Sequence, residues 1–180
     1  MTPQPSATAA PVTGHALRQF MRGWPTGLAV ITTSAGGRPA GCTVNAFISV
    51  SLHPPLLLIS LSQRSNTLAA IAELGLFGVN VLAGPQRDLA GSFSAESADR
   101  FGGVPLRWEH GVPVLTGAAA AVVCQVSQLI TAADHVLVLG RPLWCQCGAG
   151  AGPLILTGGA YYALAPPGQP GGLTAAAGQG

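Results

Sequence analysis

Short apolar runs, broken by glycine and proline, fill the chain between residues 14 and 164. Many of them contain β-branched residues and end at turn signals such as Gly36-Gly37 or Pro54-Pro55, which is typical of strands. In chain order, the pattern predicts strands at Leu28–Thr33, Ala40–Leu52, Leu56–Leu61, Leu76–Leu82, Ala118–Ile130 and His135–Leu139, with weaker ones at Leu143–Cys147 and Leu154–Thr157. A series of short strands separated by turns favours an all-β barrel or sandwich.

Three segments have the spacing or the end signals of a helix. Apolar residues recur at i, i+3, i+4 and i+7 across Ala16–Trp24, which predicts an amphipathic helix there. Ser65-Asn66-Thr67 marks the start of a second helix, Leu68–Leu74. Pro85 suits the first position of a third helix, over Gln86–Phe93.

The two ends of the chain differ from its middle. Residues 1–13 and 165–180 are rich in Pro, Ala, Gly, Ser, Thr and Gln without periodicity, so we expect disordered tails there and one domain over residues 14–164. The N-terminus lacks the basic and apolar regions of a signal peptide, and the longest apolar run, Ala118–Cys124, is far too short to span a membrane. We therefore expect a cytoplasmic protein with no membrane partner.

The composition narrows the function classes. Hydrophobic residues make up 48% of the chain and charged residues only 8%, so we expect part of the surface to be buried in a homodimer. The net charge of +2 is too weak for a nucleic-acid partner. The sequence contains no lysine, which excludes P-loop and Schiff-base chemistry.

Metal, disulfide and dinucleotide motifs are also missing. The cysteines Cys42, Cys124, Cys145 and Cys147 do not have the C-x-x-C spacing of zinc or thioredoxin-like sites, so we expect reduced thiols and no metal. The glycine-rich stretch Gly148–Pro153 has Pro at the third glycine position of a dinucleotide fingerprint, and we expect a hairpin loop.

The Ser65-Asn66-Thr67 segment is a candidate phosphate site. The first backbone N–H groups of a helix have no partner within it, and together with these side chains and Arg64 they can bind a phosphate. An ordinary helix cap explains the same three residues equally well.

Asn45 is a second candidate, because it stands in the predicted strand Thr43-Val44-Asn45-Ala46-Phe47. Asn is disfavoured in strands and needs hydrogen-bond partners there. A heterocycle with alternating donors and acceptors, such as a flavin, provides them, and so does a cross-strand or bulge hydrogen bond.

His135 follows Asp134 at the start of the apolar strand HVLVLG. An imidazole at this place can contact a substrate or donate a proton. A structural or solvated histidine at a strand edge is the alternative.

In their order and spacing, these segments resemble the flavin reductase domain family, which has the FMN-binding split-barrel fold. The likeness runs from about Arg18 to Leu164 and is carried by Trp24–Thr33, Gly37–Phe47, Ser49–Leu56, Phe77–Leu82, Asp99–Gly103, Gly111–Gly117 and Asp134-His135. It implies a mainly β fold, a six-stranded antiparallel Greek-key split barrel with a few flanking helices. It also implies a homodimer with the flavin near the subunit interface.

The resemblance also implies the site. In such proteins the flavin is lined by the residues matching Pro39, Gly41, Cys42, Thr43, Asn45 and Ala46, and its ring system is approached by those matching Ser60, Leu61 and Ser62. The resemblance further implies that Asn66 and Thr67 hold the phosphate side, with Arg87 near the phosphate or an adenylate tail. It puts His135, the catalytic position, beside the nicotinamide of NADH or NADPH, with Thr26 and Tyr161 as further coenzyme contacts.

The chain departs from the family at three places. Ala46 stands where the family usually has Ser, and Ala133 stands where it has Gly. Gly158-Gly159-Ala160-Tyr161 replaces the frequent Arg-Gly-Arg-Tyr, so Tyr161 is the coenzyme contact that remains there.

The activity implied by the resemblance is hydride transfer from NADH or NADPH to FMN or FAD, with the reduced flavin supplied to a partner flavin-dependent monooxygenase. The cofactors carry this chemistry, so no protein base is assigned, and His135 positions the nicotinamide. Two alternatives stay open. The flavin can be a fixed prosthetic group that acts on a pathway-specific substrate, or the barrel can bind flavin without catalysis.

Overall fold

The structure, a computed structural model, describes residues 11–95, 99–148 and 152–164, together with the backbone of 173–175. Three α-helices lie in these ranges, α1 (Gly14–Arg22), α2 (Asn66–Leu74) and α3 (Arg87–Ser94), and a 3-10 turn (Gly84–Gln86) leads into α3. All three were predicted to within two residues at each end. None of the helices in the described ranges is long and apolar enough to cross a membrane.

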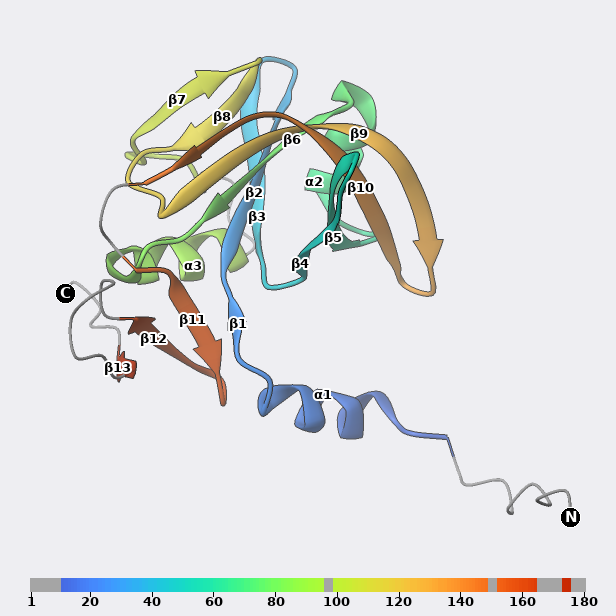
Figure 1. Cartoon of the computed structure of the whole chain (residues 1–180), viewed down its shortest axis with the longest axis vertical. Coiled ribbons are helices and arrows are strands. Elements are labelled where there is room, and N and C mark those ends of the chain that lie inside the picture. The colour runs from blue at the N-terminus through green and yellow to red at the C-terminus, as the bar shows by residue number, and fades with distance from the viewer. Residues whose placement is uncertain (1–10, 96–98, 149–151, 165–172, 176–180) are drawn as a thin grey trace, which may run out of the picture.

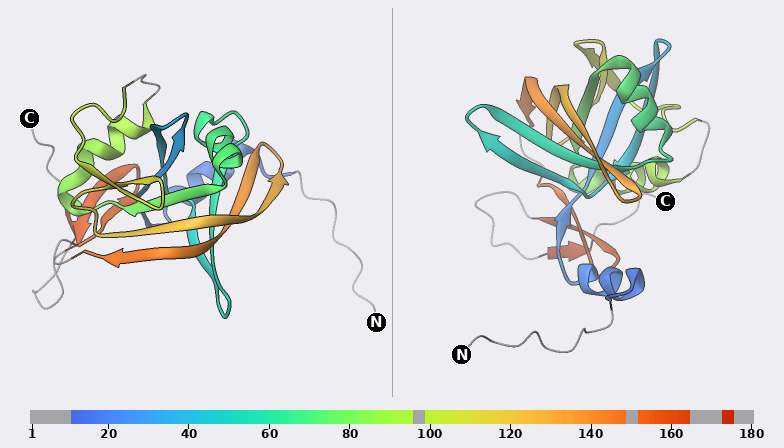
Figure 2. Two further views of the ribbon diagram at one scale, coloured as in Figure 1. Left: turned by 90° about the horizontal axis from the view of Figure 1, so that it is seen from above. Right: turned by 90° about the vertical axis from the view of Figure 1, so that its right-hand side faces the viewer.

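Seven antiparallel strands form the main sheet, in the order β3-β2-β6-β9-β10-β5-β4. Figure 2 shows the long strands β9 and β10 bending, so that the sheet curls on itself. The predicted mainly β, antiparallel fold is thereby confirmed. The strands are β2 (Ala29–Ala35), β3 (Arg38–Val44), β4 (Phe47–Leu52), β5 (Pro55–Ser62), β6 (Leu76–Val81), β9 (Ala120–Ala132) and β10 (His135–Cys147).

The strand count differs from the predicted six at two places. The stretch Ala40–Leu52, predicted as one strand, is two, because the chain bends at Asn45-Ala46 and leaves β2 to pair with β5. In contrast, two predicted strands merge into β10, with register shifts beside Gly140 and Pro142. At Gly140 a side chain would overlap the ring of Phe77, so only glycine lets these strands cross so closely.

Two smaller sheets complete the fold. One has the order β1-β11-β12-β13 and the other pairs β7 with β8. Their strands are β1 (Thr26–Gly27), β7 (Leu106–Glu109), β8 (Val112–Leu115), β11 (Leu154–Thr157), β12 (Ala160–Leu164) and β13 (Leu173–Ala175). The pattern missed all of these except β11, because they are short and several contain charged residues, glycine or proline.

The predicted tails lie mostly outside the described residues. This holds for residues 1–10, 165–172 and 176–180, and also for residues 149–151 of the predicted hairpin loop. Two details correct the prediction. Thr13 is the N-cap of α1, since its hydroxyl accepts a hydrogen bond from the Ala16 N–H at 3.2 Å. Residues 173–175 are a strand, because the edge of β12 offers them backbone partners.

Hydrophobic clusters lie on both faces of β2. Ile31 and its neighbours pack with α2, while Val30 packs with Phe93 of α3. The alternation of side chains along a strand explains this division. The two helices therefore flank β2 and β3 from opposite sides, which creates a hollow along β3.

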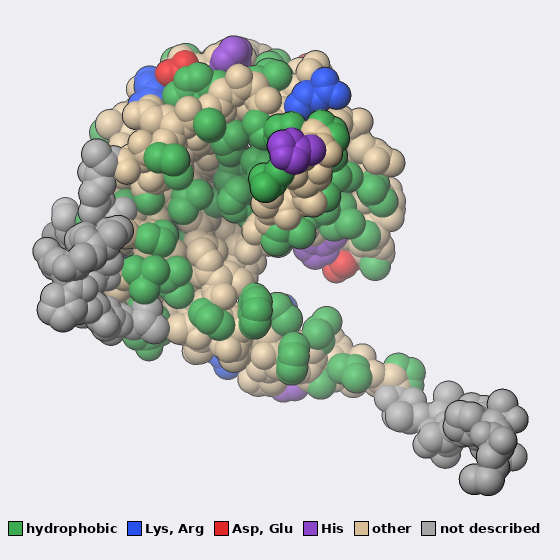
Figure 3. All heavy atoms as spheres, viewed as in Figure 1, with side chains coloured by type: hydrophobic (Ala, Val, Ile, Leu, Met, Phe, Trp, Pro, Cys, Tyr) green, Lys and Arg blue, Asp and Glu red, His purple; other side chains and the backbone are tan. Residues whose placement is uncertain are grey.

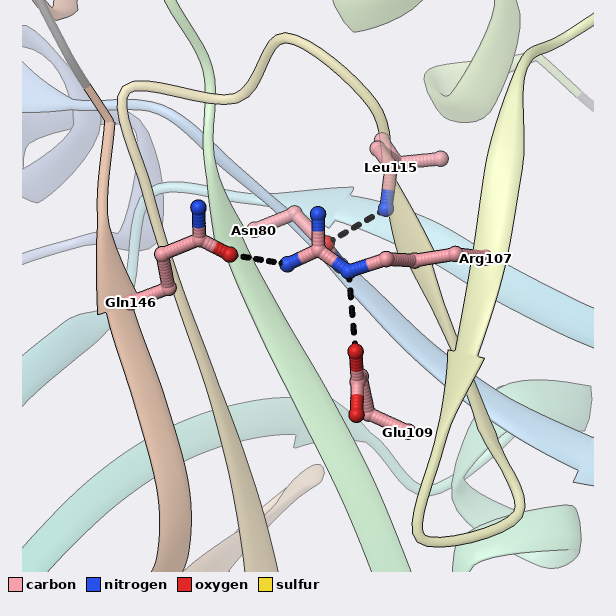
Figure 4. A network of polar contacts seen from close by, with 5 residues as sticks. All are labelled: Asn80, Arg107, Glu109, Leu115 and Gln146. Carbon is pink, nitrogen blue, oxygen red and sulfur yellow. Dashed lines mark hydrogen bonds and ion pairs between the residues drawn. The ribbon is translucent and has the colours of Figure 1, made fainter.

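Buried Asn80 holds three strands together. Its Nδ2 donates to the Val30 carbonyl and to the Thr32 hydroxyl, each at 3.0 Å, and its Oδ1 accepts from the Leu115 N–H at 2.8 Å. Figure 4 shows the contact with Leu115 beside Arg107, which pairs with Glu109 at 3.0 Å. Because every polar atom of its amide has a partner, Asn80 is a structural residue.

Helix α1 stands apart from the sheet (Figure 1). None of its residues is buried, and Leu17, Phe20, Met21 and Trp24 expose apolar side chains. In Figure 3 apolar side chains line the side of α1 that faces the rest of the molecule across a hollow.

Candidate functional site

Three neighbouring cavities follow β3, the Asn45-Ala46 bend and the end of β5. The first, of about 730 Å³, lies between the start of α2, β3 and the end of α3. The second, of about 320 Å³, lies between β3, β5 and the start of β10. The third, of about 530 Å³, extends past the bend to β1 and the end of α1. Each cavity shares lining residues with the next, Cys42 and Thr43 first and then Asn45 and Ala46, so the three form one groove.

The start of α2 forms one end of the groove. The Ser65 N–H donates to the Ser62 carbonyl at 3.0 Å, which turns the chain from β5 into the helix, and the Ser65 hydroxyl accepts from the Leu68 N–H at 3.4 Å. Ser65 is thus the N-cap, and Asn66 and Thr67 form the first turn. Arg64 lies beside them in the lining of the first cavity. A helix start next to a guanidinium favours an anion.

Arg100 adds a second positive charge to this end. Its Nη1 donates to the Gly41 carbonyl of β3 at 2.9 Å, while its buried Nε has no hydrogen-bond partner among the described residues. The next residue, Phe101, packs edge-on against Phe93 of α3 with ring centroids 4.8 Å apart, which anchors the segment. A buried N–H without a partner is unfavourable, so the site fits a ligand that brings an acceptor, such as a phosphate.

The wall shared by the first two cavities is neutral. Burial raises the pKa of the Cys42 thiol above its ordinary value, and hydrogen bonds from Thr67 and Ser65 and the charge of Arg100 oppose this only in part. The thiol is therefore protonated at neutral pH. The Thr43 hydroxyl donates to the Ala90 carbonyl of α3 at 2.9 Å, so it is held by α3.

Asn45 lies at the bend, and the prediction that it stands inside a strand is wrong. The bend is held by the Ser60 N–H, which donates to the Ala46 carbonyl at 3.1 Å. Asn45 is exposed there and lines both the second and the third cavity. Its amide is therefore open to a ligand.

His135 borders the second cavity and is directly opposite Ser62 of β5 in the strand register. Its Nδ1 lies 2.8 Å from Asp134 Oδ1, and 46% of its side chain is exposed. The hydrogen bond and the charge of His135 lower the pKa of the Asp134 carboxyl. Because Asp134 holds Nδ1, the other ring nitrogen is free to meet a ligand.

The turn before His135 is strained. Ala133 has a φ of 52°, in the left-handed region that favours glycine. Gln63 fixes this turn to the end of β5, since its Nε2 donates to the Ala133 carbonyl at 2.7 Å and its backbone N–H donates to the Asp134 carbonyl at 3.0 Å.

Several predicted site residues lie outside the linings of the three cavities. Pro39 pairs with Ser34 near the β2–β3 turn, and buried Gly41 contributes its carbonyl to Arg100. Arg87 and Tyr161 are brought together elsewhere, with the guanidinium 5.5 Å from the ring centroid. The groove does bring together Cys42, Thr43, Asn45, Ala46, Ser60, Leu61, Ser62, Asn66, Thr67 and His135, with Thr26 in the third cavity.

Comparison with known proteins gives consistent matches over most of the chain. The family model described as "Flavin reductase like domain" matches residues 21–165. A "Probable flavin reductase" of Rhizobium meliloti is 40% identical over 129 residues, which are 71% of this chain and 42% of that protein. An "NADH-dependent flavin reductase" of Rhodococcus is 36% identical over 160 residues, 85% of this chain and 88% of that protein.

Two further matches name a partner system and a ligand. A "Flavin-dependent trigonelline monooxygenase, reductase component" of Acinetobacter baylyi is 36% identical over 129 residues, 69% of this chain and 41% of that protein. The NADH:FAD oxidoreductase of Streptomyces globisporus, solved with NAD and FAD fragments, superposes with a TM-score of 0.80 at 30% identity, over 86% of this chain and 94% of that one. The chain thus spans less than half the length of the Rhizobium meliloti and Acinetobacter baylyi relatives. It spans most of the length of the Rhodococcus and Streptomyces globisporus proteins.

Proposed function

This chain belongs to the flavin reductase like domain family, and on that premise we propose that it transfers a hydride from NADH or NADPH to FMN or FAD. Its relatives include an NADH-dependent flavin reductase and an NADH:FAD oxidoreductase, both of which it matches over most of their length. The observation that carries the proposal is the groove, which has an anion-binding end, a neutral middle and His135 at the side.

The residues present fit a flavin phosphate at the α2 end. Asn66, the backbone N–H groups of the first turn and Arg100, which lines the same cavity, bind the phosphate. The neutral walls at Cys42 and Thr43 lead from there toward the bend.

The middle of the groove holds the ring system. Asn45 and Ala46 line it on one side, and Ser60, Leu61 and Ser62 on the other. Because β3 is the terminal strand of the main sheet, half of its backbone N–H groups have no partner in β2 and can donate to the edge of the ring.

The flavin, when bound, supplies the redox chemistry by accepting the hydride. The protein contributes alignment: His135, oriented by Asp134, contacts the nicotinamide, and Thr26 lines the third cavity, by which the coenzyme enters. No side chain is assigned as a proton donor or acceptor.

The protein works as a homodimer and supplies reduced flavin to a monooxygenase. The homodimer is supported by exposed apolar residues on α1 and β4, among them Phe20, Ile48, Val50 and Leu52. Burial of such an apolar surface against a second copy removes it from water and is therefore favourable. The relative named as a monooxygenase reductase component supports the partner. Cys42, Cys124, Cys145 and Cys147 are free thiols, which supports a reducing compartment such as the cytoplasm.

One anaerobic assay tests the activity. Excess free FMN or FAD is mixed with a small amount of protein and with NADH or NADPH, and the flavin absorbance is followed. Bleaching of all the flavin is expected. Reduction limited to one flavin per protein would favour a fixed prosthetic group, and no reduction would favour a barrel that only binds flavin.

A further inference from the structure

Two arginines of α1 flank a fourth cavity, of about 210 Å³, which we call the arginine cavity. Arg18 and Arg22 are four residues apart, so they lie on the same side of the helix. The opposite wall is the turn between β11 and β12, at Gly158 and Gly159. Because glycine has no side chain, this turn leaves space in front of the two guanidinium groups.

The arginine cavity continues the groove. Its lining shares Met21, Trp24 and Thr26 with the third cavity, and it shares Asn45 with both the second and the third. The arginine cavity is therefore adjacent to the cavities at Asn45, and a ligand that runs from His135 past Asn45 and Thr26 reaches the arginines.

The end of α1 is held in place although none of its residues is buried. The Gly158 N–H donates to the Arg22 carbonyl at 2.9 Å. A Cβ atom at Gly159 would lie 3.1 Å from Nη2 of Arg22, so the guanidinium rests against the turn. Arg22 thus faces the cavity from a fixed backbone position.

No carboxylate neutralises this cavity. Its lining contains no acidic residue, and within residues 11–95, 99–148 and 152–164 neither Arg18 nor Arg22 forms an ion pair. Arg107, in contrast, is paired with Glu109. Two unpaired guanidinium groups at one cavity form a site for a ligand with two negative charges.

We infer that Arg18 and Arg22 bind the diphosphate of NADH or NADPH while the nicotinamide lies between Asn45 and His135. This inference rests on the proposed function and names the coenzyme side of the same site. The guanidinium groups match phosphate oxygens with paired N–H donors, and the apolar wall at Trp24 packs against the remainder of the coenzyme.

The test measures binding of ADP-ribose, which has the diphosphate but no nicotinamide, to the protein saturated with FMN. In titration calorimetry the double variant Arg18→Gln/Arg22→Gln should bind ADP-ribose at least about tenfold more weakly, because hydrogen bonds to charged groups are lost. The variant Arg18→Lys/Arg22→Lys keeps the charges and should recover part of the affinity. The matched control is Arg38→Gln, which removes a charge at the start of β3, outside all four cavities.

A kinetic comparison separates this inference from the proposed activity. With NADH the double variant should have a raised KM, whereas 1-benzyl-1,4-dihydronicotinamide, a hydride donor without phosphates, should reduce the flavin at the wild-type rate. If wild type reduces flavin with neither donor, the proposed activity fails. If ADP-ribose does not bind wild type, or binds the double variant as tightly as wild type, the arginine cavity is not the diphosphate site. The inference would also be wrong if the double variant lost affinity for FAD but not for ADP-ribose.

Discussion

Arg100 donates a hydrogen bond from Nη1 to the carbonyl oxygen of Gly41, 2.9 Å away, and thereby fixes a positive charge from the segment after α3 to the edge strand β3. This bond uses one of the guanidinium donors and leaves the buried Nε without a partner. The arrangement explains how one end of the groove is prepared for an anion before any ligand arrives, so that little reorganisation is needed on binding.

Replacing Arg100 with Gln should weaken FMN binding by about 10- to 150-fold, the loss of a hydrogen bond to a charged group, and should leave riboflavin binding nearly unchanged. Calorimetric titration of both ligands measures the difference. Arg141→Gln, an exposed change in β10, is the control and should alter neither ligand. Equal weakening of FMN and riboflavin would show that Arg100 only supports the fold of β3.

Asn66 offers a test in which affinity and stability move in opposite directions. Asn66→Ala should weaken FMN more than riboflavin, by about 1.5–3 kcal/mol. Asn66→Asp should weaken FMN further, because its charge repels the phosphate, although an acidic residue in the first turn of α2 stabilises the helix. Urea unfolding and FMN titration of both variants give the two quantities. If the Asp variant bound FMN as tightly as wild type, the start of α2 would be an ordinary helix cap and not a phosphate site.

His135→Ala should raise the KM for NAD(P)H and slow flavin reduction while flavin affinity stays the same. A neutral hydrogen bond is worth about 0.5–1.5 kcal/mol, so we expect kcat/KM to fall about two- to twelve-fold. Asp134→Asn, which loosens the ring without removing it, should have a smaller effect.

The pH dependence distinguishes this positioning role from acid catalysis. If His135 were a general acid, its replacement would instead lower the rate of flavin reduction by about 10²–10⁴-fold, and the rate would depend on pH. Because the pKa of Asp134 is lowered, its carboxylate keeps its charge at neutral pH and loses it only as the pH falls through that lowered value. Stopped-flow measurements of wild type and His135→Ala across pH check this, because a positioning role predicts profiles of the same shape for both proteins.

Ala133→Gly should stabilise the protein by about 0.5–1 kcal/mol, because glycine adopts the φ of 52° without a steric cost. Urea titration measures the gain in the free energy of unfolding. Ala132→Gly, one residue earlier in β9, is the matched control and should lower stability. A loss of stability in the Ala133 variant would mean that the turn is not strained.

The chain should have about twice its monomer mass of 18.0 kDa in light scattering. Leu52→Asp places a charge on the exposed apolar face of β4 and should shift the mass toward the monomer without unfolding the sheet. A wild-type mass of 18.0 kDa at micromolar concentration would contradict the homodimer.

The sequence predicted the elements that depend on local patterns. The central strands and the three helices were found because their apolar spacing and end residues act within a few positions. The bend at Asn45 was missed, since a strand that changes its partner keeps the same alternation of side chains. Strands β7 and β8 were missed because four residues carry too little periodicity.

The site shows the same limit. Asn66, Thr67 and His135 could be named because the start of a helix and the start of a strand have local signals. The role of Arg100 depends on Gly41, 59 positions away, and that of Asn80 on three separate strands. Arg18 and Arg22 meet the groove only because β11 and β12 return to the end of α1. Contacts of this kind arise from the topology, which single-sequence patterns do not contain.

The isolation of α1 has an evolutionary consequence. Because no residue of α1 is buried within the chain, its polar side chains can be exchanged with little loss of folding stability, whereas mutations in the barrel must preserve a packed core. Because Arg18 and Arg22 belong to this helix, natural variation or directed evolution can adjust coenzyme preference there at almost no cost to the scaffold. A library restricted to the polar positions of α1, which leaves its apolar side chains unchanged, would therefore explore coenzyme choice separately from stability.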